Sequence, residues 1–445
     1  MQIPEIDWPE GVYADARLEE VTHTSIRVRD GVRENVTTRR EVGAFLRVMR
    51  DGMWATAATT DLTDLGAQLR VLAEAVPEGQ GIDPRAALMP HQARVTPFAS
   101  ARADAVPLAQ KLARLEAVLG AMERPSVQLW TGQWVDNYRW RAFVSSQGAE
   151  VITDSQLVGI SVRYSVGEGE QRFTDGWTAG ADTVEALDAT PEALSAALDV
   201  AERFAAEAQP VEPGEATVIL SPFVAGVFAH ESFGHKSEAD FMIGDPSMLE
   251  AWKLGVKVGS ETLSIVDDGK IHGSGYCPWD DEGQPASETW LVKEGVLTGR
   301  LHSATTATAL GESVTGNARA MSFRFEPIVR MTSTYIAPGT STKEELFAGV
   351  EDGYFIESFR HGSGMSTFTI APALAWRIRG GKIAEPVRIA VISGTVFETL
   401  GLIDGVSDGL ELMPTVTGGC GKFAQFPLPV AFGGPYVRVS SMMVA

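Results

Sequence analysis

The feature that most constrains this chain is the run His230-Glu231-Ser232-Phe233-Gly234-His235, which follows the apolar segment Val218–Ala229. Two imidazoles with a carboxylate between them are the groups that a hydrolytic zinc site requires. On a straight α-helix, side chains five residues apart diverge by about 140°, which is too far for both rings to reach one ion. A π-type turn, whose hydrogen bonds join residues five apart, would bring the rings together. We therefore expect a helix distorted around Ser232–Gly234, with the backbone yielding at Gly234.

The third ligand of such a site has to come from elsewhere in the chain, because a catalytic zinc ion needs three protein ligands and one open position. A carboxylate, a histidine or a cysteine could supply it. The best candidate is Cys420, since the glycines around it in Thr417–Lys422 would let a loop approach a metal closely. The competing interpretation is a small buried cysteine in a turn. The other cysteine, Cys277, lies beside a proline and a tryptophan, and we expect it to pack rather than to bind metal.

Several polar residues near the motif are candidates for catalysis. Glu231 is the candidate general base, because a carboxylate beside the metal can accept a proton from water and return it to the leaving amine. Glu238 and Asp240 could accept hydrogen bonds from the histidines or could lie at a solvated helix end, and the sequence leaves both possibilities open. His361 could stabilise an oxyanion, but we expect it to be a paired structural histidine.

Composition and charge limit the class of protein. Lys and Arg total 37 against 58 for Asp and Glu, and the formal charge of −21 argues against binding to nucleic acid. The first seven residues lack the basic start and apolar run of a signal peptide, and no stretch reaches the ~20 apolar residues of a membrane span. Two distant cysteines form no disulfide framework. We therefore expect a cytoplasmic protein that binds neither nucleic acid nor membrane.

The pattern of elements changes along the chain. The first part alternates strand-like stretches such as Tyr13–Arg29 with helix-like ones, among them Leu62–Ala75 after a cap at Asp61 and Pro191–Ala208 after a cap at Thr190. The second part consists mainly of short strands with glycine and proline turns, apart from the motif helix.

A linker-like run, Gln209–Gly214, separates these two parts. A chain of 445 residues is also too long for one ordinary core. We predict an α+β protein with an α/β N-terminal domain at residues 1–212 and a β-rich C-terminal domain at residues 213–445, which carries the metal-binding helix.

The motif resembles that of a known family. Residues His230–Asp240 fit the H-E-x-x-G-H-x-x-E-x-D signature of the TldD/PmbA metallopeptidases. Other stretches that resemble the family are spread over nearly the whole chain: Tyr13–Arg17, Asp280–Gly283, Thr315–Arg319, Arg330–Tyr335, Gly419–Lys422 and Pro429–Val444. The family divides into metal-bearing TldD-type subunits and PmbA-type (or TldE-type) subunits without the motif. This sequence keeps the two histidines, the glutamate and the cysteine, so it resembles the TldD type.

The resemblance implies a zinc ion held by His230, His235 and Cys420, with Glu231 as the general base. It also implies hydrolysis of unstructured peptides, including precursors of modified peptides, and a dimer with a PmbA/TldE-type subunit or with a second copy of this chain. We expect the peptide substrate to bind in an extended conformation, through backbone pairing with a strand edge near the metal. The alternative is a non-catalytic regulatory or binding subunit of a peptidase complex, which would have no need of Glu231.

Overall fold

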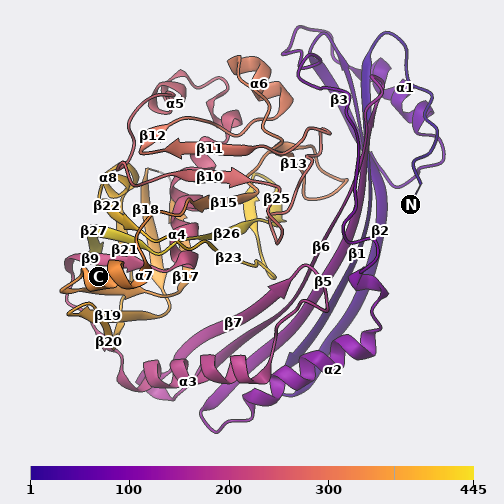
Figure 1. Ribbon diagram of the computed structural model, residues 1–445. Coiled ribbons are helices and arrows are strands. Elements are labelled where there is room, and N and C mark those ends of the chain that lie inside the picture. Colours follow the sequence, from indigo (N-terminus) through magenta and orange to yellow (C-terminus); the bar gives the residue numbers. More distant parts are fainter. Residues whose placement is uncertain (1, 365) are drawn as a thin grey trace.

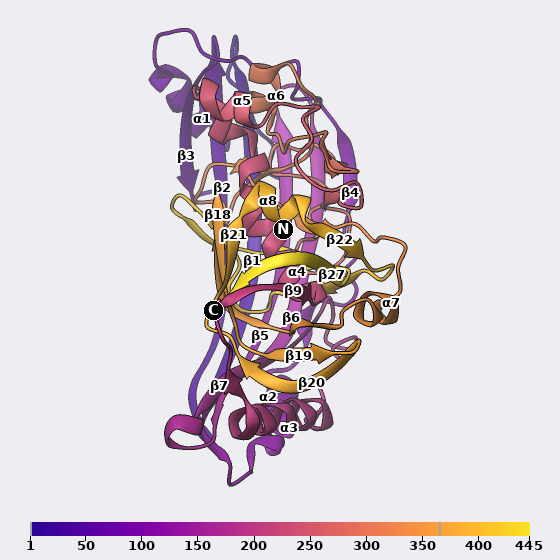
Figure 2. The ribbon, with the colours of Figure 1, turned by 90° about the vertical axis from the view of Figure 1, so that its left-hand side faces the viewer.

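The computed structural model describes residues 2–364 and 366–445, and its mixed α+β architecture confirms the fold class expected from the sequence. A tall, curved sheet from the N-terminal part stands beside the smaller strands and helices of the C-terminal part (Figure 1). The view in Figure 2 looks across the C-terminal part onto the long N-terminal strands behind it. The two parts therefore form two layers.

The N-terminal sheet is built from long antiparallel strands. Its order is β3-β2-β1-β5-β6-β4, with β7 paired to β6, and the pairing of β4 with β6 is parallel. The strands are Tyr13–Arg29 (β1), Val32–Arg50 (β2), Met53–Thr59 (β3), Gln92–Val95 (β4), Val127–Ser145 (β5), Glu150–Val166 (β6) and Phe173–Ala181 (β7). The strand predicted at Tyr13–Arg29 is confirmed at both ends.

Three α-helices accompany this sheet: α1 (Leu65–Ala75), α2 (Leu108–Leu119) and α3 (Pro191–Glu207). Short 3₁₀ turns lie at Ala103–Ala105, Gly120–Met122 and Gly169–Gln171. Helix α3 begins at the predicted cap, Thr190, whose hydroxyl accepts a hydrogen bond from the amide of Ala193. The cap predicted for α1 was wrong, because Asp64 accepts from the amide of Ala67, while Asp61 bonds to Thr63 in the preceding turn.

The two faces of the N-terminal sheet have different partners. Successive side chains of a strand point to opposite faces, so Ala16 and Leu18 lie on one side of β1 and Arg17 on the other. Ala16 and Leu18 belong to the apolar core that includes α1. Arg17, also buried, donates a hydrogen bond to the carbonyl of Ser322 in the C-terminal part. The charged face of the sheet therefore meets the part of the chain that carries the motif.

The C-terminal part contains two larger sheets and two short hairpins. The ten-stranded sheet has the order β17-β18-β21-β27-β9-β16-β19-β20-β8, with β22 paired to β27. Its strands are Gln209–Pro210 (β8), Gly214–Leu220 (β9), Asp352–Ile356 (β16), Phe359–Gly364 (β17), Thr367–Pro372 (β18), Ala375–Arg379 (β19), Lys382–Arg388 (β20), Ile392–Thr395 (β21), Ile403–Val406 (β22) and Val437–Val444 (β27).

The six-stranded sheet has the order β12-β11-β10-β15-β26-β23. Its strands are Ile265–Asp268 (β10), Glu288–Lys293 (β11), Val296–Leu297 (β12), Ser333–Ile336 (β15), Glu411–Met413 (β23) and Ala431–Gly434 (β26). The hairpins pair Ala318–Arg319 (β13) with Ile328–Val329 (β14), and Cys420–Lys422 (β24) with Gln425–Leu428 (β25).

Helix α4 (Pro222–Ala229) lies between these two sheets and leads into the motif (Figure 1). Ser221 caps its first turn by accepting from the amide of Val224. On one side, Gly226 lies so close to β26 that a Cβ on it would be 2.0 Å from the amide nitrogen of Gly433. On the other side, Phe228 packs edge-on against Phe368 of β18. These contacts fix the direction in which the chain enters the motif.

The remaining helices are short. They are α5 (Pro246–Ala251), α6 (Ala304–Leu310), α7 (Lys343–Ala348) and α8 (Val396–Gly401). In the part of the chain that the structure describes, no helix combines the length and the apolar character needed to cross a membrane.

Candidate metal centre

The two motif histidines lie on a π turn that continues α4 without a break. The π-helix covers His230–Gly234, and a 3₁₀ turn covers His235–Ser237. The amide of His235 donates to the carbonyl of His230, five residues earlier, and the two imidazole centroids lie 4.9 Å apart. The predicted distortion around Ser232–Gly234 is confirmed.

The role expected of Gly234 in this turn was wrong. Its dihedral angles, φ −56° and ψ −53°, are those of an ordinary right-handed helix. The glycine matters there for a different reason, since a Cβ would lie 2.0 Å from Sδ of Met331 and that side chain would have to shift. The close packing of the turn against Met331, rather than an unusual backbone conformation, accounts for the residue.

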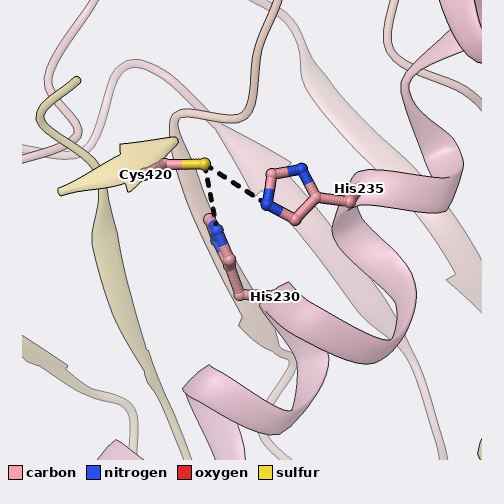
Figure 3. A group of neighbouring side chains, drawn as sticks. All are labelled: His230, His235 and Cys420. Carbon is pink, nitrogen blue, oxygen red and sulfur yellow. Dashed lines mark hydrogen bonds between the residues drawn. The ribbon is translucent and has the colours of Figure 1, made fainter. Parts of the chain in front are cut away.

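Cys420 meets both histidines from a distant part of the sequence. Its Sγ lies 3.3 Å from Nε2 of His230 and 3.4 Å from Nε2 of His235 (Figure 3). The cysteine begins β24, whose hairpin with β25 is held in place by Arg330, which donates to the carbonyls of Cys420 at 2.7 Å and Gln425 at 3.3 Å. The structure thus brings the three predicted ligands together.

The donor atoms have the spacing and the chemistry of a zinc site. With Zn–S near 2.3 Å and Zn–N near 2.0 Å, tetrahedral coordination separates a sulfur from a nitrogen by about 3.5 Å. The two observed sulfur–nitrogen distances, 3.3 and 3.4 Å, are close to that value. One thiol and two imidazoles are also a ligand set that suits zinc. The residues present therefore fit this ion.

The two motif histidines have opposite pKa shifts. Burial, together with the charges of His235 and Arg330, holds the pKa of His230 well below its usual range, so that its ring is neutral. Burial alone would also lower the pKa of His235, but hydrogen bonds to Cys420 and Glu238 outweigh it and raise this pKa to about 10. The surroundings of His235 therefore favour a positive charge, which a proton or a metal cation can supply.

Glu231 directly follows the first motif histidine in the sequence. It is half-buried, and no hydrogen bond to its side chain occurs within residues 2–364 and 366–445. Burial raises the pKa of this carboxyl, and the charge of His235 opposes the shift. Strand β17 passes beside it, since a Cβ on Gly362 would lie 3.9 Å from Cγ of Glu231. A carboxylate that interacts with the charge of His235 thus lies beside β17.

The other residues proposed from the sequence have different surroundings. Oε2 of Glu238 lies 3.1 Å from Nδ1 of His235, and the glutamate is fully buried, so it is not at a solvated helix end. Asp240 pairs with Lys422 instead of a histidine. His361 is exposed on β17 and has no hydrogen-bond partner for its ring among the described residues, so the expectation of a paired histidine was wrong. Cys277 is buried and donates to the carbonyl of Trp279, which agrees with a packing role.

The sequence reasoning missed two basic residues that support the cluster. Arg330 fixes the Cys420 hairpin, and Lys422 contacts both Glu238 and Asp240. A signal for Lys422 was present, because residues two apart in a strand share a face, and Lys422 follows Cys420 by two. Arg330 gave no such signal, since its partner is a backbone carbonyl 90 residues away.

Two family models match the chain. The model of the PmbA/TldA metallopeptidase C-terminal domain matches residues 213–445, and the model of PmbA/TldA metallopeptidase domain 1 matches residues 14–78. Among curated relatives, a metalloprotease of Methanothermobacter thermautotrophicus is 34% identical over 439 residues, which cover 97% of this chain and 95% of the relative. A zinc metalloprotease TldD homolog of Saccharolobus solfataricus is 31% identical over 72% of each chain.

Solved structures share the fold. A putative modulator of DNA gyrase from Thermotoga maritima superposes with a TM-score of 0.79 at 20% identity, covering 98% of this chain and 96% of that one. TldE from Thermococcus kodakarensis gives a TM-score of 0.75 at 16% identity, covering 97% and 96%. At these identities, the likeness concerns the architecture alone.

Proposed function

The chain belongs to the PmbA/TldD family of metallopeptidases, and from this premise we propose that it is a TldD-type peptidase that uses zinc to hydrolyse peptides without stable structure. His230, His235 and Cys420 hold the ion in this proposal. The observation that carries it is the contact of the Cys420 sulfur with both imidazoles, at 3.3 and 3.4 Å, across 190 and 185 residues of sequence. The Saccharolobus relative is named a zinc metalloprotease, which supports the choice of metal.

The chemistry is divided between the ion and the chain. A bound zinc ion supplies Lewis acidity, which polarises a peptide carbonyl and makes water a stronger acid. Glu231 accepts the proton of the attacking water at a carboxylate oxygen and then delivers it to the nitrogen of the leaving amine. His230 is held in position by Phe432, whose ring packs edge-on against the imidazole at 4.7 Å. Glu238 holds the ring of His235 through Nδ1, so that Nε2 faces Cys420.

The strand beside Glu231 supports the proposed substrate class. Strand β17 is an edge strand of the ten-stranded sheet. Among the described strands it pairs with β18 alone. Gly362 and Gly364 let it approach the motif closely, since a Cβ on Gly364 would lie 3.1 Å from the carbonyl oxygen of Glu231. An extended peptide can add to such an edge through main-chain hydrogen bonds, which favours unfolded substrates with little sequence preference.

Assembly and location belong to the same proposal. We expect a dimer with a PmbA/TldE-type subunit or with a second copy of this chain. Two large apolar side chains on the Cys420 hairpin are exposed, Phe423 at 76% and Phe426 at 61%, and such side chains suit a protein contact. Neither Cys277 nor Cys420 forms a disulfide among the described residues, which suits the reducing cytoplasm.

One experiment tests the metal and the activity together. Protein purified without chelator is analysed for its metal content and assayed on an unstructured peptide and on a folded protein. The proposal expects about one zinc per chain, cleavage of the peptide alone, loss of cleavage on chelation and recovery when zinc is restored. Neither bound metal nor cleavage, with or without a candidate partner, would favour the non-catalytic regulatory subunit instead.

A second experiment tests the mode of binding. A cleavable peptide is compared with versions that carry an N-methyl group at successive backbone nitrogens. Pairing with the edge of β17 predicts that methylation at alternate positions raises KM, because a strand edge receives hydrogen bonds from every second residue. A uniform effect along the peptide would argue against this binding mode.

A further inference from the structure

Lys422 is a buried cation that the proposed chemistry does not use. It lies at the end of β24, and its side chain is 2% exposed. Its Nζ lies 3.0 Å from Oε2 of Glu238 and 2.6 Å from Oδ1 of Asp240, and it donates to the carbonyl of Val329 at 2.9 Å. Burying an ammonium group costs several kcal/mol unless it is well paired, so three such partners point to a specific role.

The partner of Lys422 leads directly to a motif histidine. Glu238 is fully buried, and the same oxygen that pairs with Lys422 lies 3.1 Å from Nδ1 of His235. The opposite ring nitrogen, Nε2 of His235, lies 3.4 Å from Sγ of Cys420. Cys420 and Lys422 lie on the same short strand. The contacts therefore form a closed circuit of residues that links this strand to the motif helix.

We propose that Lys422 is a positioning residue, which joins the Cys420 hairpin to the motif helix through Glu238 and thereby sets the distance between the Cys420 sulfur and His235. The inference rests on the proposed metal centre. If the sulfur–nitrogen distance is already correct before metal binding, the ion need not order these side chains when it binds. Loss of a supporting partner of a metal ligand typically lowers metal affinity by about 10- to 100-fold.

A purely structural role for Lys422 makes a different prediction. The hairpin has a second anchor, because Arg330 donates to the carbonyls of Cys420 and Gln425 independently of the lysine. Loss of Lys422 should therefore leave the hairpin attached while it changes how Cys420 and His235 face each other. The readout that separates the two roles is the geometry and affinity of the metal, measured without reference to catalysis.

The test uses the full chain with zinc and cobalt(II) as probes. Zinc affinity is measured by competition with a chromophoric chelator, and the cobalt form reports geometry through its ligand-field and thiolate charge-transfer bands. Lys422→Met is expected to weaken zinc binding by about 10- to 100-fold and to alter the cobalt spectrum. Lys422→Arg should recover part of the affinity, because it restores a cation. Lys253→Met, at an exposed lysine paired with Glu250, is the matched control and should bind zinc as the wild type does.

A second variant keeps the test decisive if Lys422→Met fails to fold. Glu238→Gln removes the charge that the lysine pairs with, and Lys422→Met/Glu238→Gln removes both buried charges at once. The double variant should bind zinc about as weakly as either single variant, because both belong to one path. Wild-type affinity and an unchanged cobalt spectrum in Lys422→Met, or in the folded double variant, would overturn the inference. A wild-type protein that binds no zinc would instead overturn the proposed function.

Discussion

The imidazole rings of His230 and His235 lie 4.9 Å apart at an angle of 80°, although the two residues are five positions apart along a helix. The π turn over His230–Gly234 makes this possible, and it places both Nε2 atoms toward the sulfur of Cys420. Two ligands five residues apart and one ligand from a remote hairpin therefore converge on one point.

Replacing Cys420 should remove most of the metal. Cys420→Ala deletes one of three donor atoms, so we expect well under half of the wild-type zinc content after dialysis, measured by elemental analysis. Cys277→Ala is the matched control, because the Cys277 thiol bonds to the carbonyl of Trp279 and is not part of the cluster. Full zinc occupancy in Cys420→Ala would rule out the cysteine as a ligand.

Replacing Glu231 should abolish cleavage without loss of metal. Glu231→Gln keeps the size of the side chain but cannot accept the proton of water, so kcat should fall by about 100-fold or more while zinc content is unchanged. The exposed Glu250, changed to Gln, is the control and should keep wild-type activity. Retained activity in Glu231→Gln would eliminate this residue as the general base.

A methyl group on Gly226 should destabilise the core of the C-terminal part. In Gly226→Ala the new Cβ would lie 2.0 Å from the backbone nitrogen of Gly433, so α4 must move away from β26, at a cost of roughly 2–3 kcal/mol in urea unfolding. Gly120 is the matched control, because it has open space around it and a helical φ of −56°. Gly120→Ala should be neutral or slightly stabilising, and equal stability of the two variants would contradict the packing described here.

Asp175 of β7 should make stability depend on pH. Burial raises the pKa of this carboxyl from 3.8 to about 6; the backbone amide of Gly176 and the charge of Arg360 oppose the shift, and that of Glu357 adds to it. Because the folded state binds this proton more tightly than the unfolded state, the contribution of Asp175 to the free energy of unfolding falls as pH rises from about 4 to 6. It remains unfavourable above that range.

Asp175→Asn removes this pH dependence. The difference in unfolding free energy between the variant and wild type should grow, in favour of the variant, by about 1–2 kcal/mol from pH 4 to pH 7.5. This figure allows for solvent screening of a partly exposed group. Urea denaturation of both proteins at the two pH values measures the gain. A difference between the proteins that does not change with pH would show that Asp175 has an ordinary pKa.

The sequence alone determined the features that depend on neighbours in the chain. The alternation of Tyr13–Arg29 gave the strand with its correct ends, and Thr190 before Pro191 marked the start of α3. The spacing of His230 and His235 predicted the π turn, because a shared ion is incompatible with their separation on a regular helix. Each of these inferences uses geometry that repeats within a few residues.

Only the tertiary structure decided which distant groups meet. The sequence favoured Cys420 as a ligand, but its distance to the histidines depends on a hairpin that Arg330 anchors and that Lys422 joins to Glu238. Gly234 is explained by Met331, which lies 97 residues further along the chain and packs where a Cβ would be. Such contacts arise when whole elements pack together, so no local pattern encodes them, and their geometry is fixed only once the two sheets enclose α4.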